Sequence, residues 1–303
     1  MKIATAAKPI FKDKKRRVWE LDFLRGFAVL AMCFDHLMYD CSHPKDFFSN
    51  FKVGVNSFAD GVYKFAVSYW KSTSDYGFRF WAHYLFVFLF LFLVGTSCAF
   101  SRNNTRRGAL CGIAALVFTG ATFVCKAIGF MEDGVVFGIL DCIAMSILCT
   151  AALDSLTNLG AWITSPTPTK KQKAVVKAGE YINLYAPLVL GAVILFVGIF
   201  NQFWTIQFDR YFTDEHFLGY IFGKYAFGDD WFGLFPYLGA VLIGTYWGKA
   251  AYSTRASLLP ALDGKWHKPV IFVGRHALIF YFLHQVVLAG LFILIGLCMG
   301  FSL

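Results

Sequence analysis

The sequence predicts an all-α fold, a polytopic integral membrane bundle of about seven transmembrane helices with amphipathic segments on the outer side. Three observations support this class: 57% of the 303 residues are apolar, only 16% are charged, and the mean hydropathy is +0.56. A soluble domain usually carries about 25% charged residues. The apolar residues also gather in long runs, and a helix needs about 20 of them to cross a bilayer.

Seven apolar runs give the expected spans. They lie near residues 22–41, 78–100, 108–128, 134–153, 184–203, 231–250 and 271–298. An odd number of spans places the two termini on opposite sides of the membrane. We expect residues 1–20 to form a basic cytoplasmic arm and residues 21–303 to form a single transmembrane domain.

The distribution of Lys and Arg predicts the orientation. The N-terminal arm and the loops 102–107, 170–177 and 249–268 hold 18 of these residues, against eight on the opposite side. Because cytoplasmic loops are enriched in Lys and Arg, we place the N-terminus in the cytoplasm of a multi-pass plasma-membrane protein. The net charge of +9 then reflects topology and contact with anionic lipid, so nucleic acid is not an expected partner.

The segments between the spans differ in length. Residues 42–77 and 204–230, both on the outer side, are longer than a connection requires. Within the first of them, FKVGVNSFADGVYKFAVSYW (51–70) repeats apolar residues at helical spacing, which indicates an amphipathic helix on the outer face. The inner loop from Ser165 to Lys170 is typical of a flexible polar connection.

Eight cysteines occur without a CxxC pair, a pattern typical of buried free thiols. The polar residues of the first run, LDFLRGFAVLAMCFDHLMYD, are more informative. They are Asp22, Arg25, Asp35, His36 and Asp40. An ionisable group at the centre of a spanning helix costs about 2.5–3.5 kcal/mol by insertion scales, so such groups usually face a protein interior and serve function. An enzyme or carrier inside the membrane is therefore the leading interpretation.

Arg25, His36 and Asp40 fall on one stripe of this helix, since 11 residues at about 100° each return to nearly the same face. His36 lies about 16 Å above Arg25. Asp40, four residues after His36, could accept its ring proton and hold one tautomer, as in many catalytic bases. The structural alternative is that His36 and Asp40 anchor the helix at the outer interface.

Three further polar residues fall at a similar depth in other spans: His83 in the second, Asp141 in the fourth and His284 in the seventh. Each alone could simply hydrogen-bond a neighbouring helix. Together with His36 they predict an outer-half cluster. At the opposite face, a cytosolic phosphate could be bound by arginines, namely Arg25, Arg102, Arg106, Arg107 and Arg275. Arg25 and Arg275 lie inside their spans, so the general enrichment of arginine in cytoplasmic loops does not account for them.

Five motifs in order resemble a known family. They are RRVWELDFLRGFAVLAMCFDHLMYD, FLFLFLVGTSCAFSRNNTRRG, VVFGILDCIAMSIL, DDWFGLFPYLGAVLIG and GRHALIFYFLHQ. Over residues 16–290 the chain resembles the catalytic domain of the heparan-alpha-glucosaminide N-acetyltransferase family, in its small bacterial members. This resemblance implies that cytosolic acetyl-CoA donates an acetyl group to an amino or hydroxyl group of a sugar on the far side, such as a glycan or a lipid-linked saccharide.

The resemblance also implies roles for particular residues. Arg25 and Arg275 match the inner end that faces CoA, whereas His36, Asp40 and His284 match the polar core. Either His36 or His83 could deprotonate the acceptor or carry the acetyl group, because imidazole titrates near neutrality and is a competent nucleophile.

The chain departs from the family pattern at four places. At the position of His36 the lysosomal branch has a neutral polar residue. The lysosomal member has its catalytic histidine in the outer segment before the second span, where this chain has none; His83 is the nearest substitute and His43 a poorer one. Where many relatives read FGILH this chain has Asp141, and Gly233 stands where bacterial relatives usually have Pro.

Three functions remain open at this point: an acyltransferase, a proton-coupled transporter that uses the His/Asp cluster as a relay, and a noncatalytic scaffold. The lack of an evident pair of interrupted helices argues against the transporter, and the internal charges argue against the scaffold. The acceptor, the choice between N- and O-acylation and between ping-pong and direct transfer, and a homo-oligomeric state are also left open.

Overall fold

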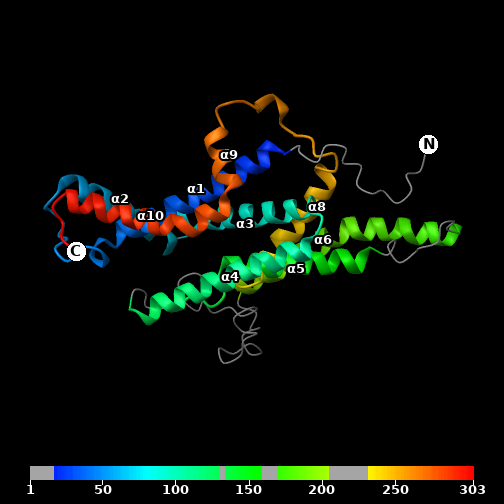
Figure 1. Ribbon diagram of the computed structural model, residues 1–303, viewed down its shortest axis with the longest axis horizontal. Coiled ribbons are helices and arrows are strands. Elements are labelled where there is room, and N and C mark those ends of the chain that lie inside the picture. Colours follow the sequence, from blue (N-terminus) through cyan, green and yellow to red (C-terminus); the bar gives the residue numbers. More distant parts are fainter. Residues whose placement is uncertain (1–16, 75, 130–133, 159–168, 205–230) are drawn as a thin grey trace. The chain divides into compact units, whose positions relative to one another are not determined.

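The computed structural model describes residues 17–74, 76–129, 134–158, 169–204 and 231–303. Within these ranges every regular element is a helix, which confirms the all-α prediction (Figure 1). The α-helices are α1 (Trp19–Ser42), α2 (Ser57–Ser74), α3 (Phe78–Cys98), α4 (Asn104–Ala127), α5 (Ile139–Thr157), α6 (Lys170–Trp204), α8 (Tyr237–Ala251), α9 (Lys268–Arg275) and α10 (Ala277–Cys298). Short 3-10 helices cover Pro44–Asp46 and Pro260–Leu262.

Among the described residues, five helices are long and apolar enough to cross a membrane: α3, α4, α5, α6 and α10. The 24 residues of α1 are long enough, but this helix carries the charges noted above. The 15 residues of α8 extend about 22 Å, less than the roughly 30 Å of a bilayer core. These five candidate spans agree with the predicted membrane class, whereas the count of seven and the cytoplasmic N-terminus stay predictions.

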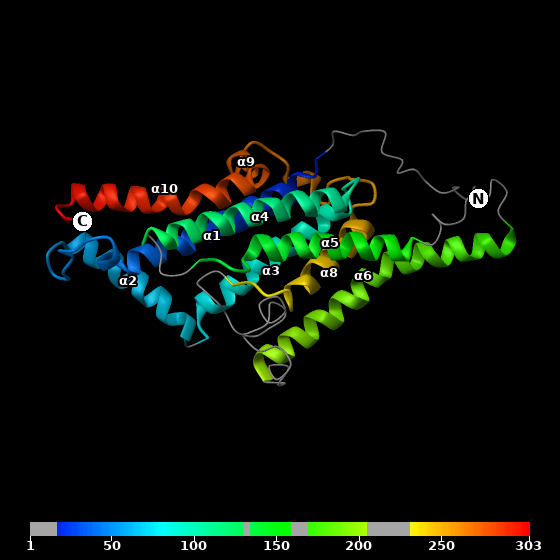
Figure 2. The ribbon, with the colours of Figure 1, turned by 60° about the horizontal axis from the view of Figure 1, so that its bottom comes forward.

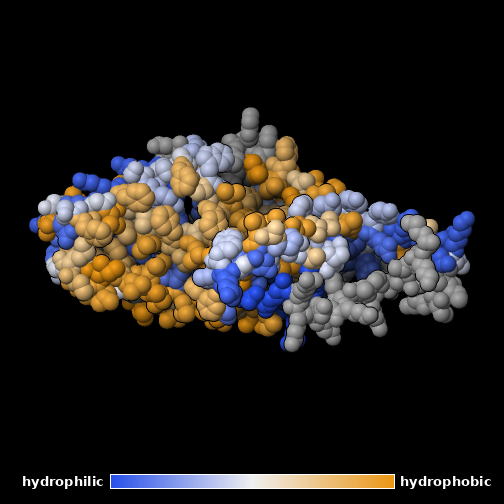
Figure 3. Space-filling model, turned by 90° about the horizontal axis from the view of Figure 1, so that it is seen from above, coloured by the Kyte–Doolittle hydropathy of each residue, from blue (hydrophilic) through white to orange (hydrophobic). Residues whose placement is uncertain are grey.

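The surfaces of these helices are strongly apolar. Large hydrophobic side chains are exposed on each, for example Leu116 of α4 at 69%, Phe196 of α6 at 69% and Val286 of α10 at 72%. Figure 3 shows broad apolar areas, drawn in orange, on the face in view. Exposed apolar patches of this kind suit contact with lipid rather than with water.

One predicted span begins well before its expected first residue. The helix expected over 184–203 begins at Lys170, because Thr169 and Gln172 form a reciprocal cap: the Thr169 N–H donates to Gln172 Oε1 (2.8 Å) and the Gln172 N–H donates to Thr169 Oγ1 (3.3 Å). The prediction of a loop over 170–177 is therefore wrong. The expected outer segment 204–230 and the loop before Lys170 lie almost wholly outside the described residues.

The last predicted span, 271–298, is two helices. The end of α9 at Arg275 is capped by the backbone N–H of His276, which donates to the carbonyls of Phe272 and Val273. After this residue the chain starts again as α10. The break keeps the charged Arg275 out of the apolar helix that follows.

Contacts divide the chain into two compact units. The first is Leu91–Ala256, and the second combines Val18–Phe90 with Ser257–Leu303. The expectation of a single transmembrane domain stays a prediction.

In the first unit α4 packs against α5, α6 packs against α8, and α5 contacts both α6 and α8. Glycines allow α8 to approach the C-terminal part of α3 closely. A Cβ at Gly95 would overlap the carbonyl oxygen of Val241, and a Cβ at Gly244 would overlap that of Phe92. Small residues at helix contacts are the usual means of close packing in membranes.

In the second unit α1 is the central helix and packs against α2, α9 and α10 (Figures 1 and 2). Its contact with α9 depends on two glycines. A Cβ at Gly26 would overlap the carbonyl oxygen of Val270, and a Cβ at Gly274 would overlap that of Asp22. The backbones of α1 and α9 therefore touch next to Asp22.

The predicted amphipathic helix is α2, which begins later than expected, at Ser57. Its Ala66 is fully buried in a cluster with Met38 and Cys41 of α1. On another side of the helix Phe58 and Phe65 are exposed at 68% and 58%. The helix thus buries one face on α1 and leaves large apolar side chains uncovered.

Candidate functional site

Two histidines predicted from different spans lie in contact in the second unit. His36 of α1 and His284 of α10 place their ring centroids 4.7 Å apart. The His284 Nε2 atom is 3.0 Å from His36 Nδ1, and the His284 Nδ1 atom is 2.7 Å from the carbonyl oxygen of Tyr281. Both imidazoles are partly buried. The structure therefore brings two residues of the predicted outer-half cluster, His36 and His284, into contact, whereas their catalytic role stays a prediction.

Asp40 belongs to the same cluster, but not as a direct partner of His36. Gln285 lies between them: its Oε1 atom is 3.2 Å from His36 Nδ1, and its Nε2 atom donates to Asp40 Oδ1 at 3.0 Å. Asp40 is 1% exposed, and its second oxygen has no hydrogen-bond partner. The interpretation that Asp40 orients His36 is corrected to an indirect link through the amide of Gln285, which bridges the two on the side of α10.

A buried ion pair lies one residue before His36. Arg79 of α3 donates to both carboxylate oxygens of Asp35, each at 2.9 Å, and also to Thr73 Oγ1 at 2.8 Å. Its guanidinium carbon stands 3.3 Å from the ring centroid of Trp70. Bidentate pairing of this kind is strong and geometrically specific, so Arg79 ties α1, α2 and α3 together.

Tyr69 of α2 completes this group. Its hydroxyl donates to Asp35 Oδ1 at 2.8 Å. Burial, followed by the hydrogen bond to Asp35, raises the pKa of Tyr69 well above its usual value. The hydroxyl therefore stays protonated at ordinary pH and continues to donate.

His83 lies four residues after Arg79, on the same side of α3. It is close enough to interact electrostatically with Asp35, Arg79 and His36. The structure places His83 beside the α1 cluster without a described hydrogen bond to His36. It remains an alternative to His36 on position alone.

The predicted donor-binding arginines meet at the other end of α1. Arg25 Nη1 lies 3.2 Å from Asp22 Oδ1, and Arg275 Nε donates to Asp22 Oδ2 at 3.2 Å. The Arg275 side chain is 44% exposed and that of Arg25 20%. One carboxylate thus holds two guanidinium groups, which gives this end of the unit a net positive charge. Their role in binding a phosphate stays a prediction.

The remaining predicted site residues belong to the first unit. The Asp141 carboxylate accepts the backbone N–H of Gly138 at 3.0 Å and thereby caps the start of α5. Arg107 lies on α4 with its Nη1 atom 3.7 Å from Cys98 Sγ, and Arg102 is exposed just before α4. The structure thus gives Asp141 a capping contact at the start of α5.

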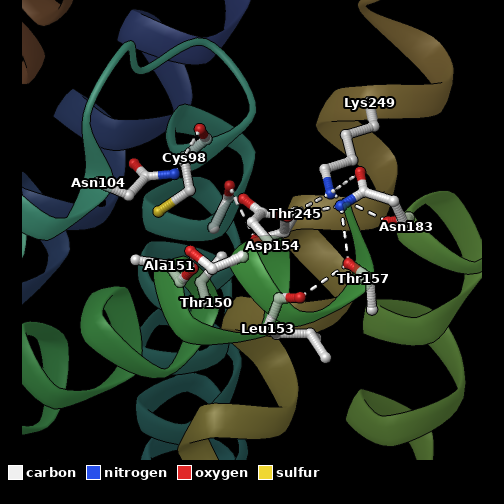
Figure 4. Close-up of polar contacts among 12 residues, drawn as sticks. Cys98, Asn104, Thr150, Ala151, Leu153, Asp154, Thr157, Asn183, Thr245 and Lys249 are labelled. Carbon is white, nitrogen blue, oxygen red and sulfur yellow. Dashed lines mark hydrogen bonds and ion pairs between the residues drawn. The ribbon is translucent and has the colours of Figure 1, made fainter. Parts of the chain in front are cut away.

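A polar cluster that the sequence analysis did not single out joins α5, α6 and α8 (Figure 4). Lys249 Nζ donates to Asp154 Oδ1 at 2.6 Å and to both the backbone and side-chain oxygens of Asn183, at 3.0 and 2.9 Å. Asn183 Nδ2 in turn donates to Thr157 Oγ1 at 2.8 Å. These contacts pair the charge of Lys249 with Asp154 and hold α5, α6 and α8 together, which indicates a structural role.

Gln285 and Arg79 are the residues of the cluster that the sequence analysis missed. Gln285 follows His284 directly in GRHALIFYFLHQ, and an amide within an apolar helix is a signal that could have marked it. Arg79 stands at the start of an apolar run, and Asp35 stands inside another; two opposite charges placed in this way could have indicated an ion pair between the helices. All eight cysteines are free, but the expectation that they are buried is met only by Cys41, Cys98 and Cys142, since Cys298 is exposed and the other four are partly buried.

Comparison with protein families matches residues 17–66, 58–167 and 180–286 to the family described as heparan-alpha-glucosaminide N-acetyltransferase, catalytic. Comparisons with curated proteins and with solved structures gave no significant match. The family match includes α1 with Arg25, His36 and Asp40, and it extends through α10 to His284 and Gln285. Because the matched segments cover most of the sequence, the chain belongs to the heparan-alpha-glucosaminide N-acetyltransferase catalytic family.

Proposed function

We propose that this protein transfers an acetyl group from cytosolic acetyl-CoA across the plasma membrane to an amino or hydroxyl group of an extracytoplasmic glycan or lipid-linked saccharide. The observation that carries the proposal is the arrangement along α1, in a chain of this acetyltransferase family. One end of the helix holds the paired arginines at Asp22, and the other holds the histidine cluster.

The separation of the two sites suits a long donor. Arg25 and His36 are 11 residues apart on α1, and Arg275 and His284 are nine residues apart along α9 and α10. Either interval spans about 14–16 Å at the rise of an α-helix. CoA carries its phosphates and its thioester at opposite ends of an extended pantetheine arm, so phosphates at the arginines would direct the acetyl group toward the histidines.

The chemistry requires a nitrogen lone pair near the thioester. In direct transfer, His36 takes the proton of the acceptor as its nitrogen or oxygen attacks the acetyl carbonyl; the C–S bond breaks, and the CoA thiolate then recovers that proton. In a two-step route the same imidazole nitrogen attacks the acetyl carbonyl first, the C–S bond breaks and the CoA thiolate leaves. The acceptor then attacks the acetyl-imidazole, the bond from the acetyl carbon to the imidazole nitrogen breaks, and the acceptor's proton ends on the CoA thiolate. Both routes need one unprotonated nitrogen on His36 facing the substrates.

The first prediction is that His36→Ala abolishes acetyl transfer but keeps acetyl-CoA binding, because a general base contributes about 10²- to 10⁴-fold to rate. Incorporation of radiolabel from acetyl-CoA into the lipid and carbohydrate fractions of membranes measures transfer, and calorimetry on purified protein measures binding. His276→Ala is the matched control, since His276 is exposed at the junction of α9 and α10 and lies outside the cluster. A loss below tenfold in His36→Ala, beside near-complete loss in His83→Ala, would move the role to α3.

A proton-coupled carrier is the second candidate, and the direct contact of two imidazoles next to a buried carboxylate favours it. A carrier would move protons in vesicles without acetyl-CoA and would not consume the thioester. Native mass spectrometry with acetyl-CoA separates the two functions, because only the acetyltransferase requires a bound donor.

A further inference from the structure

The contacts of His284 determine where its proton lies. A carbonyl oxygen can only accept a hydrogen bond, so the 2.7 Å contact with the Tyr281 carbonyl requires a proton on His284 Nδ1. A neutral imidazole has one N–H, and therefore His284 Nε2 carries a lone pair and accepts.

His36 is oriented by this lone pair and, independently, by Gln285. Its Nδ1 atom lies 3.0 Å from His284 Nε2, which accepts, so Nδ1 must carry the proton. Asp40 Oδ1 accepts from Gln285, which fixes the NH₂ end of that amide on Asp40 and its oxygen on His36. Both neighbours thus accept from the same N–H, and the proton of neutral His36 belongs on Nδ1.

We propose that Gln285 and His284 are positioning residues that hold His36 in its Nδ1–H tautomer, so that Nε2 is the atom that reacts. The assignment of this atom to acetyl transfer rests on the proposed function, whereas the tautomer itself does not. Asp40 acts one step further away, because it decides which end of the Gln285 amide faces His36.

The arrangement also provides a path for the proton. When His36 Nε2 takes a proton from the acceptor, the ring becomes an imidazolium, and its Nδ1 proton can move to His284 Nε2. His284 then carries the charge with both N–H groups bonded, one to Tyr281 and one to His36. The return of both protons restores the neutral pair as the CoA thiolate leaves as a thiol.

Several charged or titratable groups face His36 and will influence its titration. They are Asp35 and Asp40 on α1, Tyr69 on α2, Arg79 and His83 on α3, and His284 on α10. A pH profile alone would mix their effects. The test therefore uses ring-nitrogen chemical shifts, which report the tautomer of one histidine directly.

The experiment compares the wild-type chain with Gln285→Leu and His284→Gln in detergent, after labelling histidines with ¹⁵N and identifying His36 by its absence in His36→Gln. We expect a protonated Nδ1 and an unprotonated Nε2 in the wild type, and a mixture of tautomers in Gln285→Leu. We also expect kcat to fall at least about tenfold in Gln285→Leu with KM for acetyl-CoA unchanged, because a wrong tautomer removes the base without removing the binding site.

Asn183→Leu is the matched control, since it deletes another amide that bridges helices, in the polar cluster around Lys249. It should lower thermal stability while leaving the His36 shifts and the KM unchanged. A wild-type His36 protonated on Nε2, or Gln285→Leu with unaltered shifts, would overturn the inference even if acetyl transfer is real. Correct shifts in a protein that does not bind acetyl-CoA would instead count against the proposed function and leave the tautomer assignment standing.

Discussion

At the scale of single residues, the sequence identified the histidines but not the group that joins them. His36, Asp40 and His284 could be chosen because ionisable side chains inside apolar helices are costly and stand out. Gln285 is neutral, so placing it in an apolar run costs less free energy than placing an ionisable group there, and its signal in the sequence is weaker. Its function depends on α10 lying beside α1 in a particular register, which hydropathy does not determine.

The paired arginines give a second prediction. Arg275→Ala should weaken acetyl-CoA binding about tenfold or more, because a charge-assisted hydrogen bond contributes about 1.5–3 kcal/mol. Arg25→Ala should act in the same direction, and Asp22 would then keep a single cation. Calorimetry on folded, detergent-solubilised variants measures the affinity. Lys268→Ala removes an equal charge from the start of the same short helix and should change affinity much less; equal effects from Lys268 and Arg275 would indicate only a general attraction of anions.

Tyr69 gives a third prediction, which concerns pH. Because its pKa is raised by burial and by the bond to Asp35, the folded protein holds the hydroxyl proton more tightly than the unfolded chain does. The contribution to stability is then fully present below the ordinary tyrosine pKa of about 10 and is lost only as the pH rises beyond it. Tyr69→Phe should lower thermal stability by a constant amount from pH 6 to 9. A difference that disappears within that interval would argue against the contact with Asp35.

At the scale of elements, the apolar runs predicted most of the helices. Where a helix end in the structure differs from the predicted one, local hydrogen bonds that cap the helix determine it. The start of α6 at Lys170 depends on the hydrogen bonds between Thr169 and Gln172, a signal present in the sequence but hidden by the prolines just before it. The division of α9 from α10 had a signal in the sequence, since Gly274, Arg275 and His276 interrupt the apolar run between the two helices.

The contact between α1 and α9 gives a fourth prediction. Gly26→Ala places a methyl group against the carbonyl oxygen of Val270, so the helices must separate, at a cost of about 1–3 kcal/mol. Arg275 would move away from Asp22, and acetyl-CoA affinity should fall together with thermal stability. Gly61→Ala in α2 is the control, because a Cβ there meets no atom within 4 Å and alanine favours the helix by about 0.5–1 kcal/mol. Unchanged stability in Gly26→Ala would mean that the two backbones are not in contact.

At the scale of the whole molecule, contacts within the second unit determine the relative direction of its first and last helices. The helices α1 and α10 run parallel, since Arg275 meets Asp22, His284 meets His36, and Gly296 faces Phe48, just beyond the end of α1. A first and a last span that run in the same direction are what an odd number of crossings requires.

The contacts at these ends agree with the charge distribution. Ser49 and Asn50, after α1, hydrogen-bond to the C-terminal residues 300–303. At the start of α1, Trp19 Nε1 donates to Ser257 Oγ and Glu20 accepts the backbone N–H of Leu258. The sequence predicted the first pair of segments to be extracytoplasmic and the second pair to be cytoplasmic, and each pair is held together. The prediction of which end faces the cytoplasm rests only on the distribution of Lys and Arg, because the helices would pack in the same way in either orientation.

The fifth prediction therefore concerns orientation. Single cysteines at Val55 and Leu303, exposed at 71% and 69%, should react with a membrane-impermeant maleimide on intact cells, whereas cysteines at Lys265 and Lys171 should react only after permeabilisation. Cys298, the exposed native thiol, is first replaced by alanine, and this parent chain sets the background. Because Val55 and Leu303 belong to segments bonded to each other, they must give the same result; opposite labelling would contradict the packing of the second unit. Labelling of Lys265 but not Val55 on intact cells would invert the topology and place the paired arginines outside, where cytosolic acetyl-CoA could not reach them.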